Sequence, residues 1–317
     1  MTRLIGCAAL IVAAVVSTAA VAQDWPARPI RYMQPFQGLP DTLARAYNDK
    51  VAASLKQPVV PEYKLGAAGR IALAEIAKAE PSGYVIGMAT SGPLTIHPNL
   101  YRQLPYDAEK SFAVLSILGA SPMALAVPAH SPAKSVEDLR KLSQTRELNI
   151  ATGGVGGPQH LAAVLLQKTG IRATMVHFKS SAEVLPAMVN GAIDAYFDTL
   201  YQQDVFVKQG RYRALAVTSA SRAPQLPDVS TFAEIGHPEI DVHTFYATVA
   251  PAGTPQPILD KLTSAYAAAG ETAEVRDTLR RMALLPVRKP RAELEAMARD
   301  ARARWKRVID ENQIQVE

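Results

Sequence analysis

Short apolar runs rich in β-branched residues alternate with helical patterns along most of this 317-residue chain. The expected strands are residues 30–36, 58–63, 85–90, 148–152, 171–178, 192–198, 213–219 and 242–250. The expected helices are residues 41–55, 71–79, 158–168, 182–189 and 257–269. Strands that alternate with helices at these distances form parallel sheets covered on both faces. The pattern therefore predicts an α/β protein with doubly wound sheets.

Two segments are interpreted as strands that cross between lobes. One is the apolar stretch 112–127, and the other is 242–250, which is followed by the turn-rich sequence PAGTP. A chain that leaves one lobe, builds a second and returns forms two lobes joined by two hinge strands, and its ligand site lies between the lobes at the carboxyl ends of the strands. We expect lobe 1 to comprise residues 23–120 plus 246–317, and lobe 2 residues 121–245.

The N-terminus carries an apolar segment of its own. Arg3 is followed by LIGCAALIVAAVVSTAAVA, residues 4–22, which has no charged residue and ends in a small-x-small tripeptide. This pattern is typical of a cleaved secretory signal over residues 1–22, and the alternative is an uncleaved membrane helix. A signal predicts a periplasmic protein. Cys7, the single cysteine, lies within it, so the mature chain would have no disulfide, thiol nucleophile or Cys-ligated zinc.

The charge balance is mild. The sequence has 34 basic and 29 acidic residues, and removal of Arg3 with the signal leaves 33 − 29 = +4. Binding to nucleic acid requires basic residues clustered on one surface. The basic residues between 288 and 307 alternate with Glu293, Glu295 and Asp300, which favours a solvated helix face over a docking patch. No nucleic-acid partner is expected.

A glycine-rich turn separates a predicted strand from a predicted helix in LNIATGGVGGPQHLAAVLL, residues 148–166. The P-loop requires Gly-Lys-Ser/Thr four residues after its first glycine, and neither Gly153 nor Gly154 has it. The dinucleotide fingerprint requires a third glycine where Gln159 stands. The exposed amides and the start of a helix still favour an anion, and a carboxylate would suit as well as a phosphate. The alternative is a tight turn without a ligand.

Catalytic groupings are sparse. The six histidines show no HExxH spacing, and no Gly-x-Ser-x-Gly is present. Asp194 and Asp198 share one face of a predicted strand, where capping or orientation of the backbone is favoured over acid–base catalysis. His160 either donates to an anion or fills the loop. We therefore expect no enzymatic activity, no metal site and no cofactor.

Three blocks resemble a known family: TSGPLTIHPNLYRQLPYDAEKSFAVL (90–115), YRALAVTSASRAPQLPDVSTFAEIG (212–236) and VAPAGTPQPI (249–258). They are similar to the Bug family, the TctC-like periplasmic receptors of tripartite tricarboxylate transporters. The resemblance runs from about Trp25 to the C-terminus. It implies a monomeric two-lobed solute receptor that closes around a small organic acid and delivers it to integral membrane transporter subunits. The alternative is a receptor that presents the same closed form to a sensor ectodomain.

The resemblance also implies which residues contact the ligand. Backbone N–H groups and ordered waters of two facing loops would hold a carboxylate, and these loops are QPFQGLPD (34–41) and TGGVGGPQHL (152–161). Residues 90–92, 178–182 and 197–199 would face them. The expected ligand-binding residues are Phe36, Gln37, Gly38, Asp41, Arg70, Thr90, Ser91, Gly153, Gly156, Gly157, His160, Ser180 and Asp198.

The chain departs from the family pattern at three places. The first loop, between Phe36 and Asp41, is two residues shorter than in most relatives, which affects the water-mediated contact. The family's KGSG is KSSA at 179–182, and its PGAGGN turn is LGAAGR at 65–70, with Arg70 in the Asn position. If Arg70 points between the lobes, it forms a bidentate pair with a ligand carboxylate, and if it points to solvent it is an ordinary surface charge.

Overall fold

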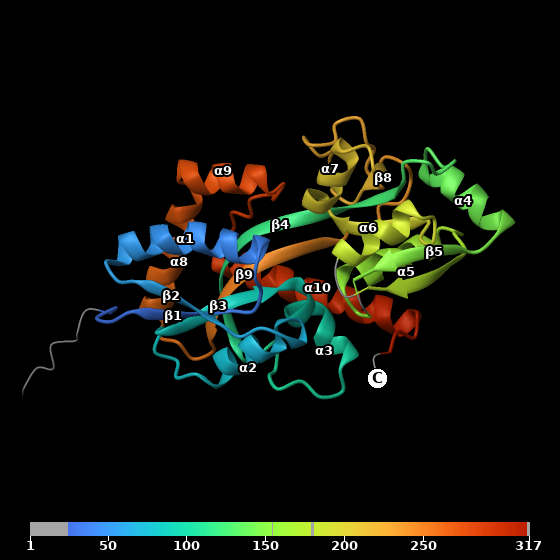
Figure 1. Ribbon diagram of the computed structural model, residues 1–317. Helices are drawn as coiled ribbons and strands as arrows, with labels where there is room; N and C mark the ends of the chain where they lie inside the picture. Colours follow the sequence, from blue (N-terminus) through green and yellow to red (C-terminus); the bar gives the residue numbers. More distant parts are fainter. Residues whose placement is uncertain (1–24, 154, 179–180, 316–317) are drawn as a thin grey trace, which may run out of the picture.

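The computed structural model describes residues 25–153, 155–178 and 181–315 (Figure 1). The predicted signal segment, residues 1–22, lies outside this range. Among the described residues, no helix combines the length and the apolar character needed to cross a bilayer.

Lobe 1 is built on three parallel strands, with β1 between β2 and β3. These strands are β1 (Ile30–Gln34), β2 (Val59–Tyr63) and β3 (Val85–Thr90). Successive residues of β1 point to opposite faces, so Tyr32 packs against helices on one face and Met33 against a helix on the other. The first face is covered by α1 (Leu39–Leu55), α8 (Gln256–Gly270) and α9 (Ala273–Arg281), and the second by α2 (Arg70–Lys78) (Figure 1).

Lobe 2 repeats the parallel arrangement, with β5 between β6 and β7. Its strands are β5 (Leu148–Thr152), β6 (Ala173–His177), β7 (Ala195–Thr199) and β8 (Tyr212–Val217). Its helices are α4 (Val136–Thr145), α5 (Pro158–Lys168), α6 (Ser181–Val189) and α7 (Leu200–Lys208). The parallel sets of both lobes confirm the prediction from alternating strands and helices.

Two long antiparallel strands join the lobes, β4 (Phe112–Pro128) and β9 (His243–Pro251). The strand order is β2-β1-β3-β9-β4-β7-β5-β6, with β8 also paired to β4. β4 exchanges partners within its length: residues up to Pro122 pair with β9, and residues from Met123 pair with β7 and β8. The α/β class with two crossing strands is confirmed. The crossing strands make the sheet mixed, because each returns antiparallel to its neighbours.

The C-terminal helix α10 (Arg291–Glu311) lies along both lobes (Figure 1). Leu294, near its start, belongs to a core cluster with Met33 of lobe 1, whereas Trp305, near its end, belongs to a cluster with Ile150 of lobe 2. The π-helix η2 (Gly92–Ile96) and the short α3 (His97–Leu100) pack beside it. The division at 120/121 and 245/246 stays a prediction, since α10 contributes to both cores.

Candidate functional site

The loop after β1 joins the strand directly to α1. Gly38 precedes the helix with φ 76°, and its carbonyl accepts from the Thr42 N–H at 3.0 Å. Gln37 and Gly38 are exposed, and Phe36 is half-buried against the turn that precedes α2. The predicted contacts of these three residues with a ligand stay predictions.

Asp41 is engaged within lobe 1. One carboxylate oxygen accepts from Arg45 Nε at 3.0 Å, and the other accepts from the Tyr63 hydroxyl at 2.9 Å. These bonds tie the first turn of α1 to the end of β2. Both oxygens thus have partners within lobe 1, so Asp41 supports the loop, and its contact with a ligand stays a prediction.

Gln34 is the last residue of β1 and the first residue of the predicted loop 34–41. No function was predicted for it. Its side chain is fully buried, and neither its amide oxygen nor its amide nitrogen has a hydrogen-bond partner among the described residues. An unpaired buried polar group costs about 1–3 kcal/mol. Its signal in the sequence was a lone amide in the apolar run IRYMQPF.

The end of β3 carries the next two predicted residues. Thr90 pairs with Tyr246 of β9, and Ser91 begins the π-helix. The Ser91 side chain is 2% exposed, and its hydroxyl lacks a partner among the described residues. π-Helical turns are frequent at functional sites. Thr90 and Ser91 thus stand at the carboxyl end of a strand adjacent to the one that ends in Gln34.

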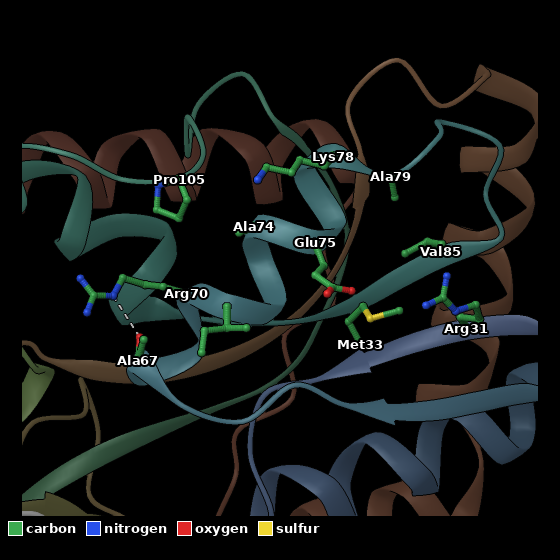
Figure 2. A pocket seen from close by; sticks show the side chains of 11 residues that line it. Arg31, Met33, Ala67, Arg70, Ala74, Glu75, Lys78, Ala79, Val85 and Pro105 are labelled. Carbon is green, nitrogen blue, oxygen red and sulfur yellow. Dashed lines mark hydrogen bonds between the residues drawn. The ribbon is translucent and has the colours of Figure 1, made fainter.

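Arg70 opens α2 after a left-handed turn. Gly66, Ala67, Ala68 and Gly69 all have positive φ, between 46° and 106°. Arg70 Nε donates to the Ala67 carbonyl at 3.0 Å, and the guanidinium carbon lies 4.0 Å from the centre of the Tyr101 ring. Figure 2 shows this guanidinium directed to Ala67 and away from Glu75 and Lys78, with which it lines a cavity of about 660 Å³ along α2. Its contacts lie in lobe 1, and a ligand contact stays a prediction.

His97 lies close to this arginine. Its ring is 4% exposed, and its Nδ1 has no partner within the described part of the chain. Burial lowers the pKa of His97 to about 4, and the positive charge of Arg70 lowers it further. The ring is therefore neutral at pH 7. No function was expected for His97, because the six histidines show no ligand spacing in the sequence.

In lobe 2 the glycine turn joins β5 to α5, as predicted. Gly157 precedes the helix, which starts at Pro158 without a side-chain cap. The first N–H groups of a helix have no intrahelical acceptor and carry its partial positive charge. The Gln159 side chain covers Gly153, since a Cβ at that glycine would lie 3.4 Å from the Gln159 amide group. Gly157 thus stands beside the first amides of α5, whereas Gly153 is covered by Gln159.

A histidine pair holds this turn. The buried His160 Nδ1 accepts from the Gly156 N–H at 3.0 Å, and the His160 and His177 rings meet edge to face at 5.2 Å. His177 Nδ1 is in turn 2.6 Å from the Thr152 hydroxyl. Burial lowers the pKa of His160 to about 4, with a smaller contribution from His177. His160 is therefore neutral with its proton on Nε2.

Two predicted residues therefore contact each other. The Gly156 N–H, expected to bind an anion, donates to His160 Nδ1. His160 keeps an N–H on Nε2, so both possibilities for it, donation to an anion and a role within the loop, stay predictions. Ser180, the remaining predicted residue between Gly157 and β7, lies outside the described residues.

Asp198 ends the set of predicted residues. It is 3% exposed, and its carboxylate accepts from the Tyr196 hydroxyl and from the Thr199 N–H, both at 2.7 Å. Burial raises the pKa of Tyr246, and the negative charge of Asp198 raises it further. Tyr246 is the ladder partner of Thr90, so a tyrosine of a crossing strand pairs with a predicted residue of lobe 1 and lies within the field of one of lobe 2. Sequence reasoning missed Tyr246 because its position depends on strand pairing.

Among the residues that the structure describes, no group of three or more His, Cys, Asp or Glu residues is arranged to bind a metal ion. Two parallel-stranded lobes, two crossing strands and amide-rich loops at the strand ends define a two-lobed periplasmic binding protein. The model of the tripartite tricarboxylate transporter family receptor matches residues 43–314, and the chain belongs to this family. The family comprises solute-binding receptors rather than enzymes, as the sequence predicted.

Relatives and solved structures agree with this assignment. Protein BugT of Bordetella pertussis is 29% identical over 98% of each chain, and a UPF0065 protein of Pseudomonas sp. strain P51 is 30% identical over 90% of this chain and 87% of its own. MatC from Rhodopseudomonas palustris with bound malate is 29% identical, with a TM-score of 0.77 over 90% of this chain and 100% of its own. Rpa4515 of R. palustris with adipate is 28% identical, with a TM-score of 0.82 over 92% and 99%.

Proposed function

We propose that this receptor works in the periplasm, where it captures a small organic acid between its lobes and delivers it to a tripartite tricarboxylate-type transporter. The observation that carries the proposal is the bond from the Gly156 N–H to His160, which positions Gly156 just before the start of α5. A turn held in this way offers the remaining amides to a carboxylate without a cost of ordering.

Groups in lobe 1 are suited to the opposite end of such a ligand. Gln34 and Ser91 are buried polar side chains at the ends of adjacent strands, and neither finds a partner among the described residues. A ligand with a second oxygen-bearing group would satisfy them. The solved relatives with malate and with adipate carry dicarboxylates of four and six carbons, so we infer a dicarboxylate of similar size.

A thermal-shift screen with dicarboxylates, tricarboxylates, aromatic acids and acidic amino acids tests the proposal. Binding to the folded state alone raises stability by about 2.7 kcal/mol at a ligand concentration one hundred times Kd, and so raises the melting temperature by several degrees. At least one dicarboxylate should do this. A flat response to all four classes would contradict a carboxylate receptor.

The variant Gly157→Asp locates the site. It places a negative charge beside the first amides of α5, so the shift with the stabilising acid should disappear while the fold is retained. Gly210→Asp is the control for the added charge, because Gly210 is exposed and has an open environment. Its φ of 67° disfavours a side chain, though less for Asp than for most residues, so the melting temperature of this control is measured first. If Gly157→Asp binds like Gly210→Asp, the ligand lies elsewhere.

Delivery to a transporter is tested in cells. Deletion of the gene should abolish uptake of the stabilising acid, and the intact gene should restore it. Normal uptake combined with loss of an acid-dependent transcriptional response would instead assign the receptor to a sensor ectodomain.

A further inference from the structure

A second cavity lies between the lobes, and none of the predicted ligand-binding residues lines it. It has a volume of about 430 Å³, within the range of small-molecule sites. Lobe 1 contributes α9 and the segment 283–288, lobe 2 contributes Leu200 and the loop 219–225, and Pro122 of β4 lies between them.

Arginines dominate the polar lining. Four of them reach the cavity, and no acidic residue of the described chain lines it; they are Arg222, Arg276, Arg280 and Arg288. Their ion-pair partners lie outside the lining: Glu234 binds Arg222, Asp277 binds Arg280, and Glu271 binds both remaining arginines. Four arginines thus share three acidic partners, which leaves one positive charge in excess within this group.

The arginines come from both lobes. Arg276 and Arg280 stand four residues apart and share one face of α9. Arg222 reaches from lobe 2, where Glu234 accepts from its Nε at 2.9 Å. Guanidinium groups bind carboxylates and phosphates through paired N–H donors, so groups on opposite walls suit an anion with two or more acidic groups.

A buried hydroxyl provides a second, independent observation. Ser219 lines the cavity, is 6% exposed, and its Oγ has no hydrogen-bond partner among the described residues. A polar group buried without a partner is uncommon in native structures and costs free energy. An anionic oxygen in the cavity would accept a hydrogen bond from this hydroxyl.

The floor of the cavity is a direct contact between the lobes. Ala283 of lobe 1 packs in one cluster with Leu200, Ala223 and Leu226 of lobe 2. Ala283 holds a left-handed conformation, φ 49°, at the end of α9. An occupant of this cavity therefore contacts both lobes beside the crossing strand β4.

We propose that this cavity is a second anion-binding site, which takes a small polyanion with carboxylate or phosphate groups. The site is separate from the glycine turn, and its occupancy does not depend on the ligand proposed above. Because its walls come from both lobes, the bound anion favours the arrangement in which Arg222 faces Arg276 and Arg280.

Isothermal titration of the full chain with citrate and with pyrophosphate, at low ionic strength, tests the proposal. At least one of the two should bind, and the pair distinguishes carboxylate from phosphate chemistry. Arg280→Glu should weaken this binding about tenfold or more, equivalent to about 1.4 kcal/mol. Arg140→Glu is the matched control, since Arg140 also pairs with an acid three residues away on an exposed helix, outside the cavity.

Two further variants separate this site from a general surface effect and from the first site. Ser219→Ala should weaken binding at least threefold without lowering the melting temperature of the anion-free protein. Gly157→Asp should leave the binding unchanged. The proposal is overturned if neither anion binds, if Arg140→Glu weakens binding as much as Arg280→Glu, if Ser219→Ala has no effect on affinity, or if Gly157→Asp abolishes binding.

Discussion

At the scale of single residues, the predicted site consists of two kinds of side chain. Some that were expected to contact a ligand also hold the backbone around them: Asp41 ties α1 to β2, and His160 accepts from Gly156. Others, such as Gln34, have buried polar atoms that no described residue satisfies. Residue types alone do not separate these roles, because a carboxylate or an imidazole serves equally as a ligand contact and as a backbone support.

The neutral state of His160 makes stability depend on pH. Its pKa is about 4 in the folded protein and about 6.5 when exposed, so the unfolded chain takes up a proton first as the pH falls. The contribution of neutral His160 to the free energy of unfolding is fully present above pH 6.5. It is lost as the pH falls toward 4, and the loss is at most about 3 kcal/mol because each pKa unit corresponds to about 1.36 kcal/mol. His97 contributes in the same direction.

His160→Asn should reduce this pH dependence, because an Asn oxygen can accept from the Gly156 N–H but does not titrate. Urea unfolding at pH 7.5 and at pH 5 measures the free energy of unfolding at each pH. Between pH 7.5 and pH 5 this free energy should fall clearly less in the variant than in the wild type. His130→Asn, at an exposed position, should behave like the wild type. Equal losses in all three proteins would contradict the assignment.

At the scale of elements, the turn before α2 is the least ordinary segment. Four successive residues have positive φ, and two of them are alanines, for which the left-handed region is unfavourable by about 1–2 kcal/mol each. Gly69 closes the turn with φ 91° and lies against Phe36, since a Cβ there would stand 3.2 Å from the Phe36 ring. The turn before α2 thus packs against the loop that follows β1.

Ala68→Gly should therefore stabilise the protein, by about 0.5–1 kcal/mol, because relief of the left-handed strain exceeds the entropy that glycine adds to the unfolded chain. Gly69→Ala should destabilise it, since the new methyl group meets both an unfavourable φ and Phe36. Equilibrium unfolding in urea measures both changes. A loss of stability in Ala68→Gly would show that the turn is not strained in solution.

Local signals predicted most of the regular elements. Strands β1, β3 and β5 and helices α1 and α5 lie where apolar periodicity, Pro and Gly indicated them. Helices α4 and α7 were not predicted: α4 is strongly polar, and α7 has little apolar periodicity in LYQQDVFVK. The π-helix was not predictable either, because its five residues read as an ordinary apolar turn. Tertiary packing, rather than local preference, stabilises such segments.

At the scale of the whole molecule, α10 connects the lobes on a route separate from the crossing strands. Its first turns pack with the core of lobe 1 and its last turns with that of lobe 2. Arg302, between them, donates to the carbonyls of Leu94 and Ala108. Any change in the angle between the lobes must therefore be accommodated along this helix as well as in β4 and β9.

Trp305 lies in the C-terminal helix, which was assigned to lobe 1, but its side chain packs in the core of lobe 2. Trp305→Ala should therefore destabilise lobe 2. The side chain is 5% exposed, so its loss should cost about 3–5 kcal/mol. Met297→Ala, on the same helix at 40% exposure, should cost under about 1 kcal/mol. Urea unfolding measures both, and hydrogen exchange should show reduced protection in β5 and β7 of the tryptophan variant. Unchanged exchange in those strands would contradict the packing of α10 on lobe 2.

The sequence by itself determined the α/β class, the alternation that builds two parallel sets, the crossing strands and the receptor family. These follow from periodicity, turn residues and family-specific blocks, all of which are local along the chain. Only the tertiary structure decided that Tyr246 pairs with Thr90, that His160 accepts from Gly156, and that α10 enters both cores. The physical reason is that these contacts depend on strand register and side-chain direction between distant segments, which residue type and spacing do not encode.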